Sequence, residues 1–164
     1  MRVDTPNRVS RTYTQHLDAP PQEVFPLLCP VREAEWVKDW RPRLVLSDSG
    51  FAEPDCVFIT PGIPEDALWL MTVHDPEALR LEIIKIIPGV VVGKISIALA
   101  PEGDDGCTSE ITYAYTALSE HGDRALEEFT EDHFRGFMKI WEKELNHFLD
   151  TGTMLENPAP SGES

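Results

Sequence analysis

The sequence predicts an α+β fold in which one curved antiparallel sheet of about seven strands lies against a long C-terminal helix. Between residues 130 and 149, large apolar side chains recur at intervals of three and four, which places them on one face of a helix. The preceding chain consists of short strand-forming segments separated by tight turns, and strands joined in this way pair antiparallel. A helix with a bulky apolar face must bury that face, and the sheet is the available partner.

The N-terminal part of the chain predicts one strand and two short helices. Residues 8–17 contain β-branched and aromatic residues in partial alternation, which favours a strand. A short helix should begin near Asp18, because the prolines that follow are tolerated in a first helical turn. A second short helix is expected within residues 31–40, where Trp36 and Trp40 stand four positions apart.

The middle of the chain predicts the remaining strands. Glycine, proline and aspartate mark the turns between successive strand-forming segments. The expected strands cover residues 43–47, 56–60, 68–74, 79–87, 90–100 and 107–118. A short helical piece at 123–129 should precede the long helix, for which Thr130 is the expected N-cap and Gly152 the expected left-handed C-terminal stop.

The sequence predicts that the two ends of the chain are less ordered than its centre. We expect residues 1–7 to form a flexible arm, residues 8–151 to form a single domain, and residues 152–164 to form a disordered tail. The chain begins without an apolar stretch and has no run of about 20 apolar residues. We therefore expect no secretory signal, no membrane insertion and a cytoplasmic location.

The composition excludes several kinds of partner. The net charge is −15, from 29 acidic and 14 basic residues, whereas nucleic acids and anionic membranes select basic surfaces. The three cysteines are far apart and the five histidines lack a metal-ligand spacing. We therefore expect reduced, buried cysteines and no metal or other cofactor. A monomer and a homodimer both fit the sequence.

Three stretches of the sequence carry a resemblance to a known family. They are residues 19–25 (Ala-Pro-Pro-Gln-Glu-Val-Phe), residues 28–33 with Trp36 and Trp40 behind them, and residues 113–119 (Tyr-Ala-Tyr-Thr-Ala-Leu-Ser). With the element order, they resemble the START-like SRPBCC superfamily, the helix-grip proteins that include birch-pollen-type allergens and polyketide cyclases. The resemblance covers roughly residues 8–150 and implies an apolar cavity between the curled sheet and the long helix.

Alternation along the predicted strands selects residues that face this cavity. Glu110 belongs in water, so Tyr113 and Tyr115 on the opposite side of the same strand point inward. They could form hydrogen bonds with a ligand, or they could be core rings whose hydroxyls reach the surface or a backbone group. Lys85 shares the inward side of its strand, but we expect its side chain to reach solvent at the strand end. Alternation on the other strands adds Trp69, Ile95 and Ile97 to the wall.

The long helix should supply the opposite wall. Phe137 and Trp141 lie near the centre of the apolar face, so we expect both to be core residues that also line the cavity. His133 and Glu144 flank this face on the same side. His133 could act at the cavity rim as a proton donor or an acid–base group, or it could be a solvated boundary residue.

The predicted function is binding of a small hydrophobic or aromatic molecule, for example a lipid or a polyketide. One alternative is a cyclase- or aromatase-type enzyme that uses a pocket tyrosine or His133 as a general acid. A further alternative is a protein-interaction module, as in the chaperone-activating branch of this fold. That alternative predicts an exposed apolar patch of several hundred Å². The sequence contains no phosphate-binding, dinucleotide-binding or nucleophile-elbow motif.

Overall fold

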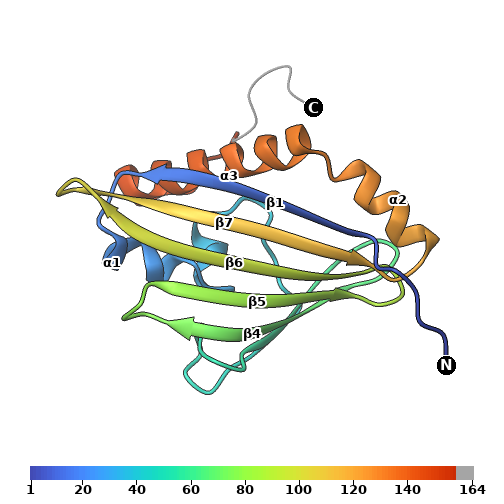
Figure 1. Cartoon of the computed structure of the whole chain (residues 1–164). Coiled ribbons are helices and arrows are strands. Elements are labelled where there is room, and N and C mark those ends of the chain that lie inside the picture. The colour runs from blue at the N-terminus through green and yellow to red at the C-terminus, as the bar shows by residue number, and fades with distance from the viewer. Residues whose placement is uncertain (158–164) are drawn as a thin grey trace.

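One seven-stranded antiparallel sheet forms the body of the protein in the computed structural model (Figure 1). The structure describes residues 1–157, so residues 158–164 of the expected tail lie outside the described part. The strands are β1 (Arg8–Leu17), β2 (Leu44–Leu46), β3 (Val57–Thr60), β4 (Ala67–Asp75), β5 (Arg80–Ile87), β6 (Val91–Glu102) and β7 (Gly106–Ala117). They lie in the order β1-β7-β6-β5-β4-β3-β2.

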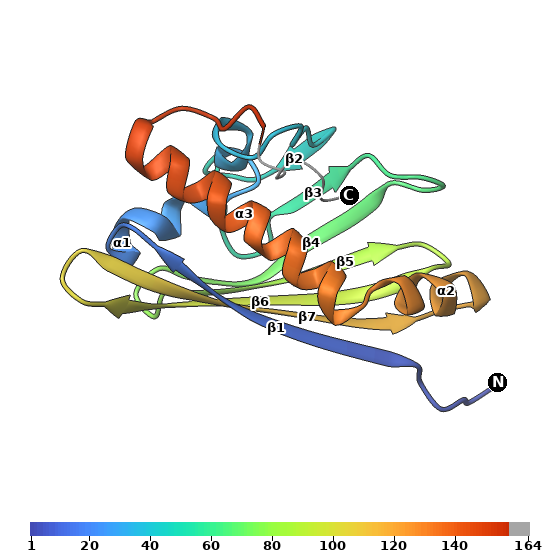
Figure 2. The ribbon, with the colours of Figure 1, turned by 90° about the horizontal axis from the view of Figure 1, so that it is seen from above.

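Helical segments lie against one face of this sheet. They are α1 (Pro21–Val24), the 3-10 turns η1 (Phe25–Leu27) and η2 (Arg32–Glu35), α2 (Glu120–Glu128) and α3 (Glu131–Thr151). Figure 2 shows α3 running across the sheet, with α2 beyond its N-terminal end and α1 near its C-terminal half. The predicted α+β helix-grip fold is confirmed, and the strand ends differ from the expected ones by at most two residues.

Both ends of α3 are capped as the sequence predicts. The Thr130 hydroxyl accepts a hydrogen bond from the backbone N–H of His133 at 3.1 Å, which satisfies one of the free donors in the first turn. Gly152 has φ 70°, and its N–H donates to the carbonyl oxygen of Phe148 at 2.8 Å. A residue without a side chain reaches this left-handed conformation without steric strain.

The core fills the space between one stripe of α3 and the inner face of the sheet. Phe134, Met138 and Leu145 of α3 are fully or almost fully buried. They pack in one cluster with Leu17 of β1 and Ile111 of β7. Their spacing of four and seven keeps the three helix residues on one side of α3. This stripe joins the helix to the sheet.

The outer face of β2–β5 is apolar and partly exposed. Leu44 pairs with Ile59, which pairs with Leu68 on the other side. The same face carries Leu46 and Leu70, and four of these five leucine and isoleucine side chains are classed as exposed. No helix within residues 1–157 is both long enough and apolar enough to cross a membrane.

Candidate functional site

A cavity of about 670 Å³ lies between α3 and the inner face of the sheet. Residues 133–144 of α3, the segment 28–41 around η2 and strands β3–β7 line it. Most of the wall is aliphatic or aromatic. Its polar residues are Glu33, Lys38, Asp39, Arg41, Thr60, Lys85, Tyr113, Tyr115, His133 and Glu144.

All eight residues selected from the sequence lie on the wall of this cavity. Strand β4 supplies one, β6 two, β7 two and α3 three; they are Trp69, Ile95, Ile97, Tyr113, Tyr115, His133, Phe137 and Trp141. The structure thus brings together residues that are separated by up to 72 positions in the chain. Their role in binding a ligand stays a prediction.

Phe137 differs from its expected place in the core. Its side chain is 46% exposed, whereas Phe134 and Met138, its neighbours on the helix surface, are buried. The stripe that meets the sheet contains Phe134, Met138 and Leu145. Phe137 falls on the adjacent stripe with His133, and both residues line the cavity. A molecule bound in the cavity would therefore cover an aromatic ring that solvent now contacts.

Lys85 points into the cavity, which corrects the expectation that it reaches solvent. Its Nζ lies 4.7 Å from the centre of the Trp69 ring and 5.9 Å from that of Tyr115. The pairing of β4 with β5 has one register shift, between Met71 and Val73 of β4, so alternation along β5 is not broken at Lys85. Burial lowers the pKa of Lys85 because it disfavours the charged form.

Lys85 belongs to a row of paired residues that crosses five strands on the inner face. The paired positions, from β3 to β7, are Phe58, Trp69, Lys85, Gly93 and Tyr115. Phe58 and Trp69 stack with their ring centres 5.2 Å apart and planes at 11°. A Cβ atom on Gly93 would lie 2.5 Å from Cε1 of Tyr115. The missing side chain at position 93 therefore lets the Tyr115 ring lie over β6.

Glu33 and Tyr113 form a second polar region of the wall. Burial raises the pKa of the Glu33 carboxyl group to about 8, so the group is largely protonated at neutral pH. Burial also raises the pKa of Tyr113, and the nearby charges of Tyr115 and Glu33 act in the same direction. Burial raises the pKa of Tyr115 to about 12. The cavity therefore holds a neutral carboxylic acid and two neutral phenols at pH 7.

The loop after η2 covers one side of the cavity and is joined to α3 by a buried carboxylate. The backbone N–H of Lys38 donates to Oε2 of Glu144 at 2.7 Å. Burial raises the pKa of Glu144, and this hydrogen bond opposes the shift. The indole N–H of Trp40 donates to the Pro30 carbonyl oxygen at 2.7 Å. These bonds hold Trp40 against the cavity wall.

Several polar groups on the wall are already satisfied, whereas others are free. The Trp69 indole N–H donates to the Thr60 hydroxyl at 2.9 Å. Within residues 1–157, no hydrogen bond is formed by the Glu33 carboxyl group, the Lys85 ammonium group or the hydroxyls of Tyr113 and Tyr115. Free polar groups on an otherwise apolar wall are the usual means by which a small-molecule site orients its ligand.

Sequence reasoning missed Glu33 and rejected Lys85. Strand alternation already pointed Lys85 inward, and that signal was sufficient to place it. Glu33 lies in η2, a four-residue 3-10 segment, which is too short for any apolar period to define its inward face. In the described part of the chain, no group of three or more His, Cys, Asp or Glu side chains could hold a metal ion. Cys29, Cys56 and Cys107 are buried free thiols.

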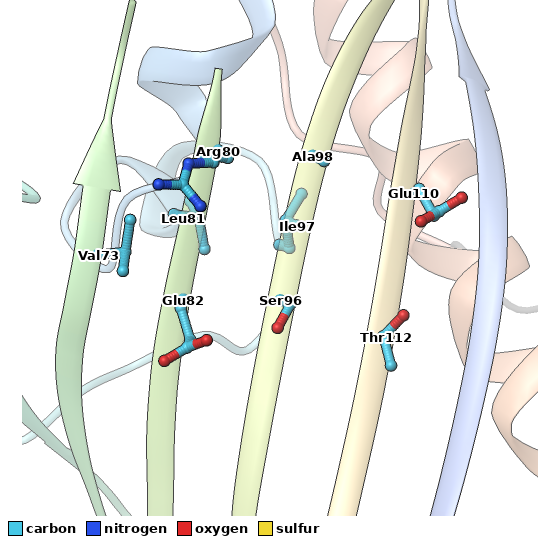
Figure 3. Close-up of a pocket in the computed structure, with 9 residues that line it drawn as sticks. All are labelled: Val73, Arg80, Leu81, Glu82, Ser96, Ile97, Ala98, Glu110 and Thr112. Atoms are coloured by element: carbon cyan, nitrogen blue, oxygen red, sulfur yellow. The ribbon is translucent and has the colours of Figure 1, made fainter. Parts of the chain in front are cut away.

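A second hollow, of about 210 Å³, lies on the outer face of the sheet (Figure 3). Polar side chains from three adjacent strands surround it, including Glu82, Ser96 and Thr112. Glu82 forms an ion pair with Lys94 at 3.4 Å. This hollow is smaller, has a mixed polar and apolar lining, and lies on the face away from α3. We therefore treat the larger cavity as the candidate site.

Solved structures of low sequence identity share this architecture. Norcoclaurine synthase from Thalictrum flavum has a TM-score of 0.64 and 13% identity over 89% of this chain and 88% of that chain. A protein from Thermobifida fusca has a TM-score of 0.63 and 18% identity over 84% and 93% of the two chains. CalU16 from Micromonospora echinospora has a TM-score of 0.56 and 18% identity over 94% and 89%.

The chain therefore has the same helix-grip fold as these structures, and the fold that the sequence resemblance implied is confirmed. No protein-family model and no curated protein matches the sequence. A second structure of norcoclaurine synthase, with 14% identity and a TM-score of 0.64, is a complex with dopamine and hydroxybenzaldehyde. Proteins of one fold differ in function, so the site must carry the functional argument.

Proposed function

We propose that this protein binds a small hydrophobic or aromatic molecule in the cavity between α3 and the sheet. The observation that carries the proposal is an aromatic cavity of about 670 Å³ with free polar groups on its wall. Small-molecule sites usually enclose roughly 300–1,000 Å³ and combine apolar walls with a few orienting polar groups. Norcoclaurine synthase, which has the same fold, binds two small aromatic molecules, and this supports the proposal.

Titration with the neutral dye N-phenyl-1-naphthylamine tests the proposal, with fluorescence as the readout. Ile83 lies on the cavity wall and Ile84 follows it on the opposite face of β5. We expect Ile83→Trp to fill the cavity and weaken dye binding at least about tenfold, which corresponds to about 1.4 kcal/mol. Ile84→Trp is the matched control and should bind the dye as the wild type does.

Two results would contradict cavity binding. The wild-type protein could fail to bind the dye at micromolar concentrations, or Ile83→Trp could bind it as tightly as Ile84→Trp does. Circular dichroism of both variants checks that the fold is kept. A cytoplasmic location and a monomer or homodimer remain predictions, which fractionation of source cells and sedimentation of the pure protein test.

A cyclase- or aromatase-type enzyme is the second candidate function, and Glu33 is the observation that favours it. A carboxyl group with a pKa of about 8 can donate or accept a proton near neutral pH. Its charge raises the pKa of Tyr113, and both residues line the cavity. Chromatography after incubation with a polyketide-like 1,3-dicarbonyl compound separates the candidates, because a binding protein returns the compound unchanged.

The exposed apolar face of β2–β5 supports the alternative function, a protein-interaction module. Leu44, Leu46, Leu68 and Leu70 are each more than a third exposed. Contiguous apolar surface of this kind is typical of interaction sites. Sedimentation of the pure protein over a range of concentrations detects self-association through this face.

A further inference from the structure

Lys85 is a cation inside an apolar cavity, and the described part of the chain provides no anion for it. Three acids share the cavity wall with Lys85, namely Glu33, Asp39 and Glu144. None of them forms an ion pair with it within residues 1–157. Burial alone accounts for the lowered pKa of Lys85. A carboxylate close enough to hold the charge would have raised it instead.

The pKa values of the acids lead to the same conclusion. Burial is the one cause that raises the pKa of Glu33, with no opposing effect from a nearby cation. The carboxylate of Glu144 accepts the Lys38 backbone N–H and therefore already has a partner. An ammonium group beside either carboxyl group would have lowered that pKa. The acids and Lys85 thus occupy separate parts of the same cavity.

Aromatic rings replace only part of the solvation that Lys85 loses. Its Nζ lies over the face of Trp69 and nearer to that ring than to Tyr115. Such cation–π contacts attract the ammonium group but do not accept its hydrogen bonds. Within residues 1–157, the three N–H donors of Lys85 have no acceptor. The Lys85 side chain is partly buried, and a charged group that loses water usually gains a counter-charge and hydrogen bonds.

The surroundings of Lys85 leave room for an anion with an aromatic body. On β6, the paired residue is Gly93, and the Tyr115 ring lies over it, so the room for a ligand is that of the 670 Å³ cavity which Lys85 and Tyr115 both line. On β4, the paired residue is Trp69, which stacks on Phe58. A ligand in this cavity can therefore carry an anionic group to within hydrogen-bonding distance of the ammonium nitrogen.

We propose that the ligand of this cavity is a small aromatic or apolar acid whose carboxylate pairs with Lys85. This inference rests on the proposed function, because it assigns a chemical class to the molecule that the cavity binds. The carboxylate supplies both the counter-charge and the hydrogen-bond acceptors that the protein lacks at this point. Lys85 then selects acids over neutral molecules of the same shape.

The test compares two probes of nearly identical shape, 2-naphthoate and 2-naphthamide, as competitors of N-phenyl-1-naphthylamine at pH 7. We expect the wild-type protein to bind naphthoate at least about tenfold more tightly than naphthamide. Lys85→Met should reduce this preference to about twofold or less and leave the affinity for naphthamide within about threefold. Lys94→Met is the matched control, because Lys94 lies on the outer face and pairs with Glu82. It should keep the full preference.

Each outcome bears on one of the two proposals. If the neutral dye binds but the wild type binds both probes equally, the assignment of an acid is wrong and cavity binding stands. If Lys85→Met keeps the tenfold preference, Lys85 is not the counter-ion, and the assignment is also wrong. If the dye does not bind at all, the proposed function fails and this inference fails with it. The wild-type comparison needs no variant, so it decides even if Lys85→Met does not fold.

Discussion

Two stripes of side chains on α3 differ in how they contact the sheet: one packs against it and the other faces the cavity. Phe134, Met138 and Leu145 pack on β1 and β7 without space between them. His133 and Phe137, each one position before a residue of the packed stripe, face the cavity. Successive residues differ by about 100° around the helix axis, so a shift of one position moves a side chain from the packed core to the cavity wall.

Strand β7 repeats this difference along its length. Ser109 and Ile111 are completely buried, whereas Tyr113 and Tyr115 line the cavity on the same inner face. The packed half contains compact side chains in mutual contact, and the hollow half contains rings, phenols, an acid and a base. A core that served stability alone would exclude the last two, because buried charges without partners destabilise a fold. The comparison teaches that the two halves differ in polarity as well as in packing, and this difference supports the proposed ligand site.

The largest expected difference between the two stripes is in their contribution to stability. Leu145→Ala should lower the free energy of unfolding by about 4 kcal/mol, since it opens a void in a fully buried site. Phe137→Ala removes more atoms, yet it should cost less than about 1 kcal/mol because its ring is half exposed. Urea denaturation measures both. Equal losses would mean that the two stripes do not differ in this way.

A second, smaller effect should appear in the pH dependence of the free energy of unfolding. The folded-state pKa of Glu33 is about 8, and in the unfolded chain it is about 4.3. Between these values unfolding releases a proton, so stability falls as pH rises from about 4.5 to about 8. Relative to the wild type, Glu33→Gln should therefore gain roughly 3 to 4 kcal/mol from pH 5 to pH 8.

Urea denaturation of Glu33→Gln at pH 5, 6, 7 and 8 checks this slope. Glu35→Gln is the control, because Glu35 lies in the same turn but is exposed and pairs with Arg32 at the surface. Its effect should stay below about 1 kcal/mol at every pH. A pH-independent difference between Glu33→Gln and the wild type would show that Glu33 is ionised in the folded protein.

The smallest expected effect is that of Gly93→Ala, at about 1 kcal/mol. The new methyl group would collide with the Tyr115 ring, but the ring can move into the cavity. We expect weaker binding of N-phenyl-1-naphthylamine together with this modest loss of stability. In a Tyr115→Ala background, Gly93→Ala should have almost no effect on binding, and a double-mutant cycle measures the coupling. An unchanged dye affinity in the single variant would place the ring outside the binding space.

The fold could be predicted because its signals are long and periodic. The helix from Thr130 onward has five turns of regular apolar spacing, and the strands alternate on either side of clear turn residues. Tyr113 and Ile95 could be placed because one exposed neighbour, Glu110 or Lys94, fixes the face of each strand. Such signals average over many residues, so a local exception does not hide them.

The polar part of the site could not be predicted in the same way. Lys85 follows the alternation of its strand, but lysine is so rarely buried that the expectation of exposure outweighed the pattern. Glu33 lies in a 3-10 turn whose orientation depends on tertiary contacts with α3 and the sheet. The exposure of Phe137 depends on a rotation of α3 smaller than the width of its apolar face. Lys85 was thus misplaced by a general expectation about lysine, whereas Glu33 and Phe137 depend on tertiary packing that no periodic pattern records.

The distribution of tryptophan gives the protein a built-in optical signal. The chain contains four tryptophans. Trp40, Trp69 and Trp141 line the cavity, and Trp36 packs on Trp141 with ring centres 5.2 Å apart. Every indole chromophore therefore lies in or next to the candidate site, and none reports on a distant region. Changes in intrinsic fluorescence or near-ultraviolet circular dichroism will thus follow occupancy of the cavity, without any label.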